Sequence, residues 1–296
     1  MTKRRRVVLD TDTYNEVDDQ FALAHLLMSP DIVDLEAVYA APFFNHRSAG
    51  PADGMERSYE EILRVLDLVD PESRPPVFRG ATAYLPTVNT PVQSSAAEDL
   101  VERALALEED ETLYVVGIAA ATNIASALLL APEIAEKITV VWLGGHAPYW
   151  PDTREFNLQQ DPWAARVLLE AKVPLVLLPC YPVTSHLITT VAELEDQLAP
   201  HSELGRYLTD IVRDYCGNPA AWSKNIWDIA ASAWIINPDW VTVDTLPAPE
   251  LKRNLTWNLQ PQRRLIQIAR TVNRDGIFGD FFAKARLTAR EPALQP

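Results

Sequence analysis

The sequence predicts an α/β fold, a mostly parallel sheet flanked by helices in a single Rossmann-like domain over residues 1–296. Two observations lead to this prediction. Short apolar runs rich in β-branched residues alternate with helical patterns, which is typical of a parallel sheet covered on both faces. No internal repeat, low-complexity tract or clear linker divides the chain, and α/β domains often reach this length. A hydrophobic content of 48% is ordinary for a globular protein.

The first elements follow from local patterns. RVVLD (6–10) is a short apolar run that ends in an acid, and it predicts a buried strand. Residues 18–29 carry acids in their first turn, where the helix dipole favours them, and they predict a helix. LEAVYAA (35–41) predicts a second strand, and the amphipathic pattern of 55–69 predicts the next helix.

The same alternation continues along the chain, with short apolar runs predicting strands and longer periodic segments predicting helices. Three long stretches between these elements are rich in Pro, Gly, Ser or Asn, and they predict loops of the kind that often carry function. The further strands are 112–119, 138–145, 173–180 and 264–272, the further helices are 122–132, 161–171, 191–198, 202–215 and 225–236, and the loops are 42–54, 86–95 and 216–225.

Composition excludes several classes of protein. The net charge of −15 argues against a nucleic-acid partner, because phosphate binding needs a basic surface. No stretch approaches 18 apolar residues, so no membrane span is expected, and the N-terminal apolar stretch is too short for a signal peptide. We therefore expect a cytoplasmic protein. Cys180 and Cys216 form no CxxC motif and are expected to be reduced thiols.

Five carboxylates crowd the segment LDTDTYNEVDDQFAL, directly after the first predicted strand. They are Asp10, Asp12, Glu16, Asp18 and Asp19. Like charges this close repel and raise one another's pKa unless a positive group lies among them. Ligands of parallel sheets bind beyond the carboxyl ends of the strands, so a binding site is expected at this point.

Three interpretations compete for this cluster. Acids can simply cap a solvated helix start, although capping requires none at the strand end. Carboxylates also bind hard cations such as Ca²⁺ or Mg²⁺, and the lack of His and Cys argues against zinc. Third, VVLDTDT (7–13) fits the D-x-D-x-T of haloacid-dehalogenase-type phosphatases, but the later segment GDFFAK (279–284) lacks the paired acids of those enzymes.

The cluster resembles the D-x-D-x-x-x-D-D signature of the inosine-uridine-preferring nucleoside hydrolase family, with a spacing two residues longer. Four more pieces resemble family motifs in chain order: a G-x-L-T-N-x-A turn, a strand ending in Gly-Gly, an E-F-N segment and a late H-D-x-x-A helix. These pieces are GIAAATNIA (117–125), VVWLGG (140–145), REFNLQQDPWAA (154–165) and WDIAASAWIINP (227–238).

The resemblance implies a nucleoside-hydrolase-like fold and calcium-dependent hydrolysis of a ribonucleoside, or a related N-riboside, to ribose and free base. It implies that Asp12, Asp19 and Asp228 bind calcium together with the backbone carbonyl of Thr122. Asp12 would also act as general base on a calcium-held water. Asp10 would be a supporting acid. Family members are commonly homodimers or homotetramers, so a homo-oligomer is expected.

The resemblance also implies sugar-binding residues. Asp18, Glu155 and Asn157 would hold the ribose hydroxyls, and Asn15, in the longer turn, either joins them or only lengthens the turn. The alternatives are structural. Asp228 and Thr122 can be helix N-caps, and Glu155 and Asn157 can be surface loop residues.

The chain departs from the family pattern at several points. Trp227 stands where a histidine proton donor is common; it can stack on a base with ~1–3 kcal/mol, or it is a core residue. The family's H-G-x-D-G has no match, the comparable region being FRGATAYL (78–85), and two family asparagines are missing. His146 is the nearest replacement acid or base. Tyr149, Trp150 and Trp222 are further candidates for base contact.

These departures favour one alternative function, a metal-dependent binding protein for ribose ligands that has lost turnover.

Overall fold

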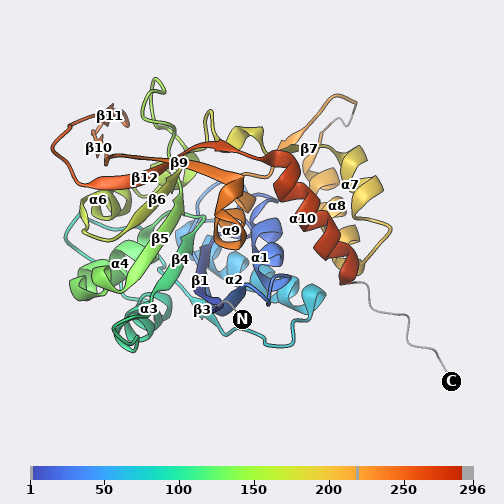
Figure 1. Cartoon of the computed structure of the whole chain (residues 1–296), viewed down its shortest axis with the longest axis horizontal. Helices are drawn as coiled ribbons and strands as arrows, with labels where there is room; N and C mark the ends of the chain where they lie inside the picture. Colours follow the sequence, from blue (N-terminus) through green and yellow to red (C-terminus); the bar gives the residue numbers. More distant parts are fainter. Residues whose placement is uncertain (1–2, 218–219, 289–296) are drawn as a thin grey trace.

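β1 (Arg5–Thr11) lies in the middle of an eight-stranded sheet in the computed structural model, which describes residues 3–217 and 220–288. The strand order is β3-β2-β1-β4-β5-β6-β12-β9, and every neighbouring pair is parallel except β12 and β9 (Figure 1). The other strands of the sheet are β2 (Val33–Ala40), β3 (Val77–Arg79), β4 (Leu113–Gly117), β5 (Ile138–Leu143), β6 (Leu175–Leu178), β9 (Val241–Pro247) and β12 (Leu265–Val272).

Helices cover both faces of this sheet, and short strand pairs and 3-10 turns complete the connections (Figure 1). The helices are α1 (Asp19–Leu27), α2 (Pro51–Val69), α3 (Ser95–Leu105), α4 (Thr122–Leu130), α5 (Phe156–Gln160), α6 (Pro162–Glu170), α7 (Val191–Gln197), α8 (Glu203–Tyr215), α9 (Ile229–Ile236) and α10 (Arg274–Leu287). Two small antiparallel sheets pair β7 (Ile188–Thr189) with β8 (Lys224–Asn225) and β10 (Glu250–Leu251) with β11 (Trp257–Asn258).

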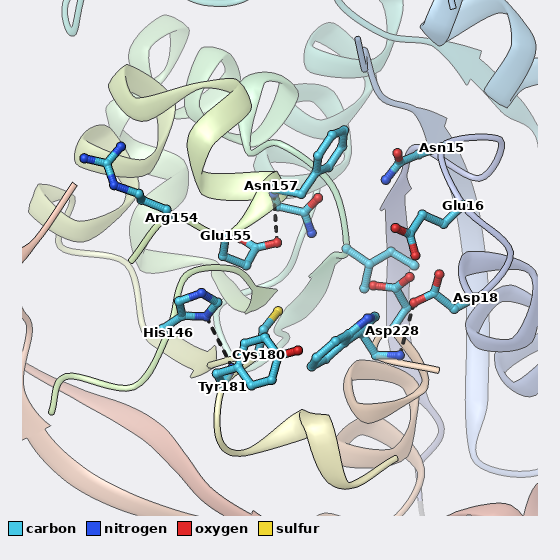
Figure 2. Close-up of a pocket in the computed structure, with 13 residues that line it drawn as sticks. Asn15, Glu16, Asp18, His146, Arg154, Glu155, Asn157, Cys180, Tyr181 and Asp228 are labelled. Carbon is cyan, nitrogen blue, oxygen red and sulfur yellow. Dashed lines mark hydrogen bonds between the residues drawn. The ribbon is translucent and has the colours of Figure 1, made fainter. Parts of the chain in front are cut away.

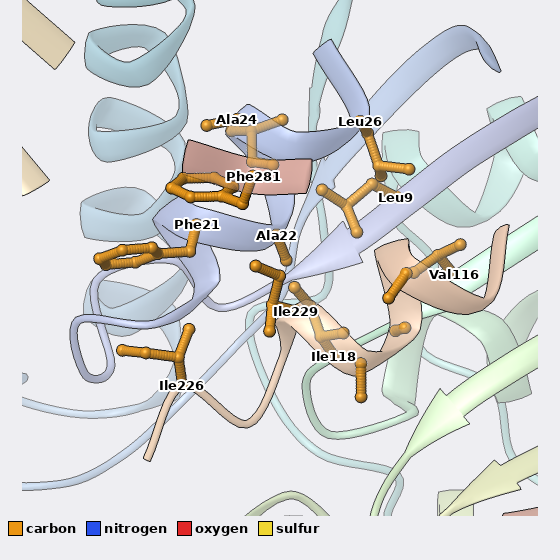
Figure 3. Packing of buried hydrophobic residues seen from close by; sticks show 14 of the residues in the cluster. Leu9, Phe21, Ala22, Ala24, Leu26, Val116, Ile118, Ile226, Ile229 and Phe281 are labelled. Atoms are coloured by element: carbon orange, nitrogen blue, oxygen red, sulfur yellow. The ribbon is translucent and has the colours of Figure 1, made fainter. Parts of the chain in front are cut away.

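The core consists of two hydrophobic layers, one on each face of the sheet. Successive side chains of a strand point to opposite faces, so Val7 and Leu9 join the layer under α1, α2, α9 and α10, while Val8 joins the layer under α3, α4 and α6. Figure 3 shows the first layer, where Leu9 and Phe21 pack near Ile229. Burial on both faces explains why the β1 sequence is a continuous apolar run.

The predicted α/β architecture is confirmed, and so are the predicted strands of the parallel sheet. Two predicted boundaries are wrong. α2 begins at Pro51, inside the predicted loop 42–54, with proline in the first turn where its missing N–H costs nothing. α9 begins at Ile229 rather than residue 225, because β8 pairs with the distant β7 instead.

The elements that were not predicted are the helices α3, α5 and α10, the edge strands β3 and β9, and the short strands β7, β8, β10 and β11. Part of the predicted loop 216–225, residues 218–219, lies outside the described residues. Both cysteines are free, as expected. Across residues 3–217 and 220–288, no helix combines the length and apolar character needed to span a membrane.

Candidate active site

The candidate site lies at the carboxyl end of β1, where the strand order turns from β2 to β4. Backbone pairing holds β1 to both neighbours up to its last residues. The Ile118 N–H donates to the Asp10 carbonyl (2.9 Å), and the Ala41 N–H donates to the Thr11 carbonyl (2.8 Å). Asp12 is the first residue beyond this pairing, and the chain then turns into α1. Such a switch point in strand order is where open α/β sheets form a binding crevice.

Three buried carboxylates, those of Asp18, Asp19 and Asp228, offer oxygens that lie within 4.8 Å of one another. Thr11 Oγ1 donates to Asp19 Oδ1 (2.5 Å), and the Trp227 N–H donates to Asp18 Oδ2 (3.1 Å). Asp228 occupies the N-cap position of α9 but makes no side-chain capping bond. The capping interpretation of Asp228 is therefore wrong, and its carboxylate faces the other acids (Figure 2).

Asp12 is fully buried, and neither of its carboxylate oxygens has a hydrogen-bond partner within the described parts of the chain. One oxygen of Asp10 is unpartnered in the same way. A buried charge without a partner is strongly unfavourable. These unpartnered oxygens are the observation that most directly indicates a cation-binding site.

The raised pKa values of the clustered carboxyl groups also indicate a cation-binding site. Burial raises the pKa of Asp10 and of Asp19 to about 7, with the Asp18 charge adding to the effect on Asp19. Burial, followed by repulsion from neighbouring acids, also raises the pKa of Asp12 and of Asp228. A divalent cation among these groups would reverse these shifts. The donors are all carboxylate oxygens, so the site fits a hard cation.

The ligand set expected from the sequence is brought together only in part. The tight group contains Asp18, which we expected to contact ribose, and it does not contain Asp12. Asp12 nevertheless lies close enough to Asp18 and Asp19 for their charges to raise its pKa. Thr122 is the first residue of α4, after the N-cap Ala121, and its hydroxyl donates to Asp161 Oδ2 (2.8 Å).

Asn123 is a site residue for which the sequence suggested no role. Its amide donates to Asp10 Oδ1 (2.7 Å), and its Oδ1 accepts the Ala81 N–H (2.8 Å). The chain passes so closely here that a Cβ on Gly80 would lie 2.1 Å from the Ala40 carbonyl oxygen and 2.4 Å from Asn123 Nδ2. Glycine is therefore required at this point of FRGATAYL.

Glu155 and Asn157 are buried, so their interpretation as surface loop residues is wrong. Glu155 is the N-cap of α5, and its carboxylate accepts the N–H groups of Asn157 (2.8 Å), Leu158 (3.0 Å) and Gly145 (2.8 Å). Asn157 Nδ2 donates to the Leu143 carbonyl (3.1 Å). These bonds hold the E-F-N segment against the end of β5.

These groups surround a cavity of about 220 Å³, which Figure 2 shows in close-up. Glu16, Asp18 and Asp228 lie on one side of it, and Glu155, His146 and Tyr181 lie on the other. Trp227 lines the cavity and meets Tyr181 edge to face, with ring centroids 5.3 Å apart. The lining residues are Asn15, Glu16, Asp18, Ile118, His146, Arg154, Glu155, Phe156, Asn157, Cys180, Tyr181, Trp227 and Asp228.

The predicted aromatic contacts differ in where they lie. His146, Tyr181 and Trp227 form an aromatic wall of the cavity. Trp150 stacks on Tyr181 (5.8 Å between centroids) without lining the cavity, and so supports this wall. Tyr149 is 70% exposed, and Trp222 packs on Tyr215; neither lines the cavity. Tyr181 is a lining residue that was not predicted, because its position after β6 carries no motif.

The longer turn after β1 contributes directly to the site. Asn15 and Glu16 both line the cavity. Lys224, from β8, is buried and forms ion pairs with Glu16 and with Asp18 Oδ1 (3.4 Å). Burial disfavours its charge, but the two carboxylates more than offset this and raise the pKa of Lys224. Lys224 was not predicted as a site residue, since its partners lie about two hundred residues away.

The phosphatase interpretation finds no support in the structure. Asp280, in the segment GDFFAK, accepts hydrogen bonds from His25 (2.8 Å) and Lys284 (2.6 Å). It does not line the cavity. No second acid pair is therefore supplied from this segment.

Comparison with known proteins identifies the family. The profile described as "Inosine-uridine preferring nucleoside hydrolase" matches residues 7–279. The pyrimidine-specific ribonucleoside hydrolases RihA of Escherichia coli O81 and Salmonella agona are each 26% identical to this chain, covering 81% of it and 84% of their own length.

Solved structures agree in fold. The purine-preferring ribonucleoside hydrolase from Gardnerella vaginalis superposes with a TM-score of 0.75 at 21% identity, covering 96% of this chain and 99% of its own. An inosine-guanosine nucleoside hydrolase gives 0.76 at 19% identity, with the same coverage. The profile match spans nearly the whole chain and includes every carboxylate of the cluster. The chain therefore belongs to the inosine-uridine preferring nucleoside hydrolase family of N-glycosyl hydrolases.

Proposed function

We propose that this chain hydrolyses the N-glycosidic bond of a ribonucleoside in the cavity beside Trp227, with calcium as its metal and Asp12 as general base. The observation that carries the proposal is the pair of buried, unpartnered oxygens of Asp12 among other buried acids. A carboxylate in this state is poised to bind a cation and to accept a proton.

Asp12, Asp19 and Asp228 would hold the ion through their carboxylates, and Thr122 would add its backbone carbonyl. All donors are oxygens, and Ca²⁺ accepts six to eight of them in a flexible arrangement. When bound, calcium would offset the negative charge of the cluster and lower the pKa of a coordinated water. Asp10 supports this set through Asn123, which fixes one of its oxygens.

The chain's own residues would orient the substrate. Asp18, Asn157 and Asn15 line the cavity with groups that can bind sugar hydroxyls. Glu155 also lines it, while its three backbone hydrogen bonds keep the carboxylate in place. Negative charge around the sugar stabilises the oxocarbenium-like transition state of glycoside hydrolysis. Trp227 offers a face on which a departing base can stack.

The relatives are named for different bases. The curated relatives are named as pyrimidine-specific, and the structural neighbours are named as purine-preferring and inosine-guanosine hydrolases. The cytoplasmic location and the homodimeric or homotetrameric state expected from the sequence stay predictions.

The deciding experiment measures release of free ribose from a panel of purine and pyrimidine nucleosides, with and without a calcium chelator. We expect release that the chelator abolishes and that added calcium restores. Release unaffected by exhaustive chelation would overturn the calcium assignment. Nucleoside binding without any release of base would instead favour the ribose-ligand binding protein.

A further inference from the structure

His146 enters the cavity from a tightly constrained turn after β5. Gly145 has a φ of +69°, a backbone conformation that side chains disfavour, and a Cβ there would lie 2.5 Å from Thr153 Oγ1. The His146 N–H donates to the same Thr153 oxygen (2.9 Å), and its carbonyl accepts the Trp257 indole N–H (2.8 Å). These hydrogen bonds fix the backbone of His146 independently of any contact that its ring makes.

The ring itself has one nitrogen in use and one free. Nδ1 lies 3.3 Å from the Tyr181 backbone nitrogen and accepts its N–H, so a neutral ring carries its proton on Nε2. The Nδ1 bond is the only hydrogen bond of the ring to residues 3–217 or 220–288, which leaves Nε2 free. The ring lies edge to face with Tyr181 (5.3 Å) and Trp150 (6.4 Å), and it lines the cavity (Figure 2).

Hydrolysis of an N-glycosidic bond needs a hydrogen-bond donor on the base side. The electron pair of the breaking C–N bond moves onto the base, and a donor placed there stabilises that charge. Four of the side chains that line the cavity, those of Glu16, Asp18, Glu155 and Asp228, are carboxylates, which only accept when ionised. Arg154 donates through one Nη to the Asn254 carbonyl (3.1 Å), and its guanidinium points away from the acids and the aromatic rings (Figure 2). The remaining donors on the aromatic wall are His146 Nε2, the Tyr181 hydroxyl and the Trp227 indole.

We propose that His146 is the leaving-group donor of this enzyme, giving its Nε2–H hydrogen bond to a ring nitrogen or carbonyl oxygen of the departing base. The inference rests on the hydrolysis proposed above. The sugar carbon gains the hydroxyl of water, Asp12 takes the water proton, and the base receives its proton from solvent. His146 therefore need not ionise, because a neutral imidazole can stabilise developing negative charge through its N–H alone.

The surroundings of His146 favour this neutral state. Burial lowers the pKa of the imidazole, and the Asp152 carboxylate opposes this only in part. The buried Glu155 carboxylate also lines the cavity, but its oxygens are occupied by three backbone N–H groups. A neutral ring with a fixed tautomer is a permanent donor at neutral pH.

The test compares two leaving groups in the calcium-loaded enzyme. A nucleoside needs a donor, whereas p-nitrophenyl β-ribofuranoside releases a phenolate that is stable without one. His146→Ala should lower kcat/KM for the best nucleoside about 10²-fold or more, and lower it far less for the p-nitrophenyl riboside. His146→Gln, which keeps an N–H donor, should recover part of the loss, and calcium affinity measured by calorimetry should not change.

The exposed His201 provides the matched control, since His201→Ala should behave as wild type on both substrates. Equal losses on both substrates in His146→Ala would overturn the proposal and leave His146 a structural residue. A selective loss in Tyr181→Phe without one in His146→Ala would move the role to the tyrosine. If the wild-type enzyme hydrolysed neither substrate, the proposed function itself would fail, which is a different result.

Discussion

Asp12 is completely buried and has two unpartnered oxygens. A substitution that removes its charge is therefore expected to lower activity and to raise the stability of the calcium-free protein. Asp12→Asn keeps the shape of the side chain but removes one charge from a cluster whose members repel. We expect it to abolish calcium binding and to lower hydrolysis by at least about 10²-fold. We also expect it to raise the stability of the calcium-free protein by about 1 kcal/mol or more.

Calorimetric titration with calcium measures the loss of binding. Denaturant unfolding in the presence of a chelator measures the change in stability. Asp31→Asn, at an exposed position after α1, is the control and should change neither. Asp228→Ala should likewise lose metal binding and activity. Full calcium affinity in a variant that carries both site changes would refute the ligand assignment.

The raised pKa values give the calcium-free protein a pH-dependent stability. Burial holds the pKa of Asp10 and Asp19 at about 7, above the ordinary value of 3.8. Between these values the folded protein holds protons that the unfolded chain has released, so the free energy of unfolding falls as pH rises. We expect Asp10 to contribute a loss of stability from about pH 4 to about pH 7 in chelator.

The comparison that isolates this contribution is wild type against Asp10→Asn, since the variant cannot titrate at this position. Its unfolding free energy should fall less over the same pH interval. Saturating calcium should also flatten the wild-type dependence, because bound carboxylates stay ionised. Parallel curves for the two proteins in chelator would contradict the assigned pKa shift.

Trp227 is the departure from the family pattern that bears most on the substrate. Its indole lines the cavity, so the interpretation as a core residue alone is insufficient. We expect Trp227→Ala to lower kcat/KM on the preferred nucleoside by about 10- to 100-fold through lost stacking, with calcium affinity unchanged. Trp227→Phe should recover part of the loss. An unchanged rate in the alanine variant would return Trp227 to a packing role.

At the scale of single residues, the acids of the site could be predicted from the sequence, but the residues that contact them could not. Asp12, Asp18 and Asp19 stand in one segment after a strand, and that local pattern is enough to predict a site. Asn123 and Lys224 reach the same point from distant segments, and only the three-dimensional fold shows that they contact it. The free nitrogen of His146 is likewise invisible in sequence, since the Tyr181 backbone determines it.

Among the elements, the longer turn between β1 and α1 is joined to β8 through the Lys224 ion pairs with Glu16 and Asp18. Removing one partner of a buried pair leaves an uncompensated charge. We expect Lys224→Met to lower the stability of the calcium-free enzyme by about 3–5 kcal/mol and to raise KM for the nucleoside, since Glu16 and Asp18 line the cavity.

Thermal unfolding in chelator and steady-state kinetics with calcium test this expectation. Lys172→Met, at an exposed position, is the matched control and should leave both measurements near wild type. Glu16→Gln together with Lys224→Met should lose less stability than the sum of the single changes, because the two residues share one interaction. Additive losses would show that the ion pair does not couple the turn to β8.

The success of element prediction depended on how local the signal was. Strands buried on both faces, such as β1 and β5, have apolar runs that no other element explains. The edge strand β9, with the pattern VTVDTLP, is only partly buried and lacks such a run. α10 was missed because two glycines interrupt its sequence, RDGIFGDFFAKARL, although its phenylalanines pack into the core.

For the whole molecule, we expect the buried negative charge to make calcium, the proposed cofactor, a stabilising ligand as well. The chain carries a net charge of −15, and its central acids repel when no cation is present. At one hundred times its Kd, a ligand that binds only the folded state adds about 2.7 kcal/mol. We expect calcium to raise the Tm by about 5–10 °C.

Differential scanning fluorimetry over a calcium series measures this shift, and magnesium at equal concentration ranks the two ions. Asp228→Ala should remove the calcium-dependent part of the shift. A Tm that does not respond to calcium in the wild-type protein would count against a resident metal ion in this cluster.

The order of these segments along the chain has a consequence for folding during translation. The acids that follow β1 are translated long before Asp228 and the α9 helix that packs beside α1, and β12, which pairs with β6, comes later still. A nascent chain on the ribosome therefore holds half of an acidic centre, exposed to water, until residue 228 has emerged. The complete acidic cluster then exists only in a chain in which the segment after β1 has met the start of α9.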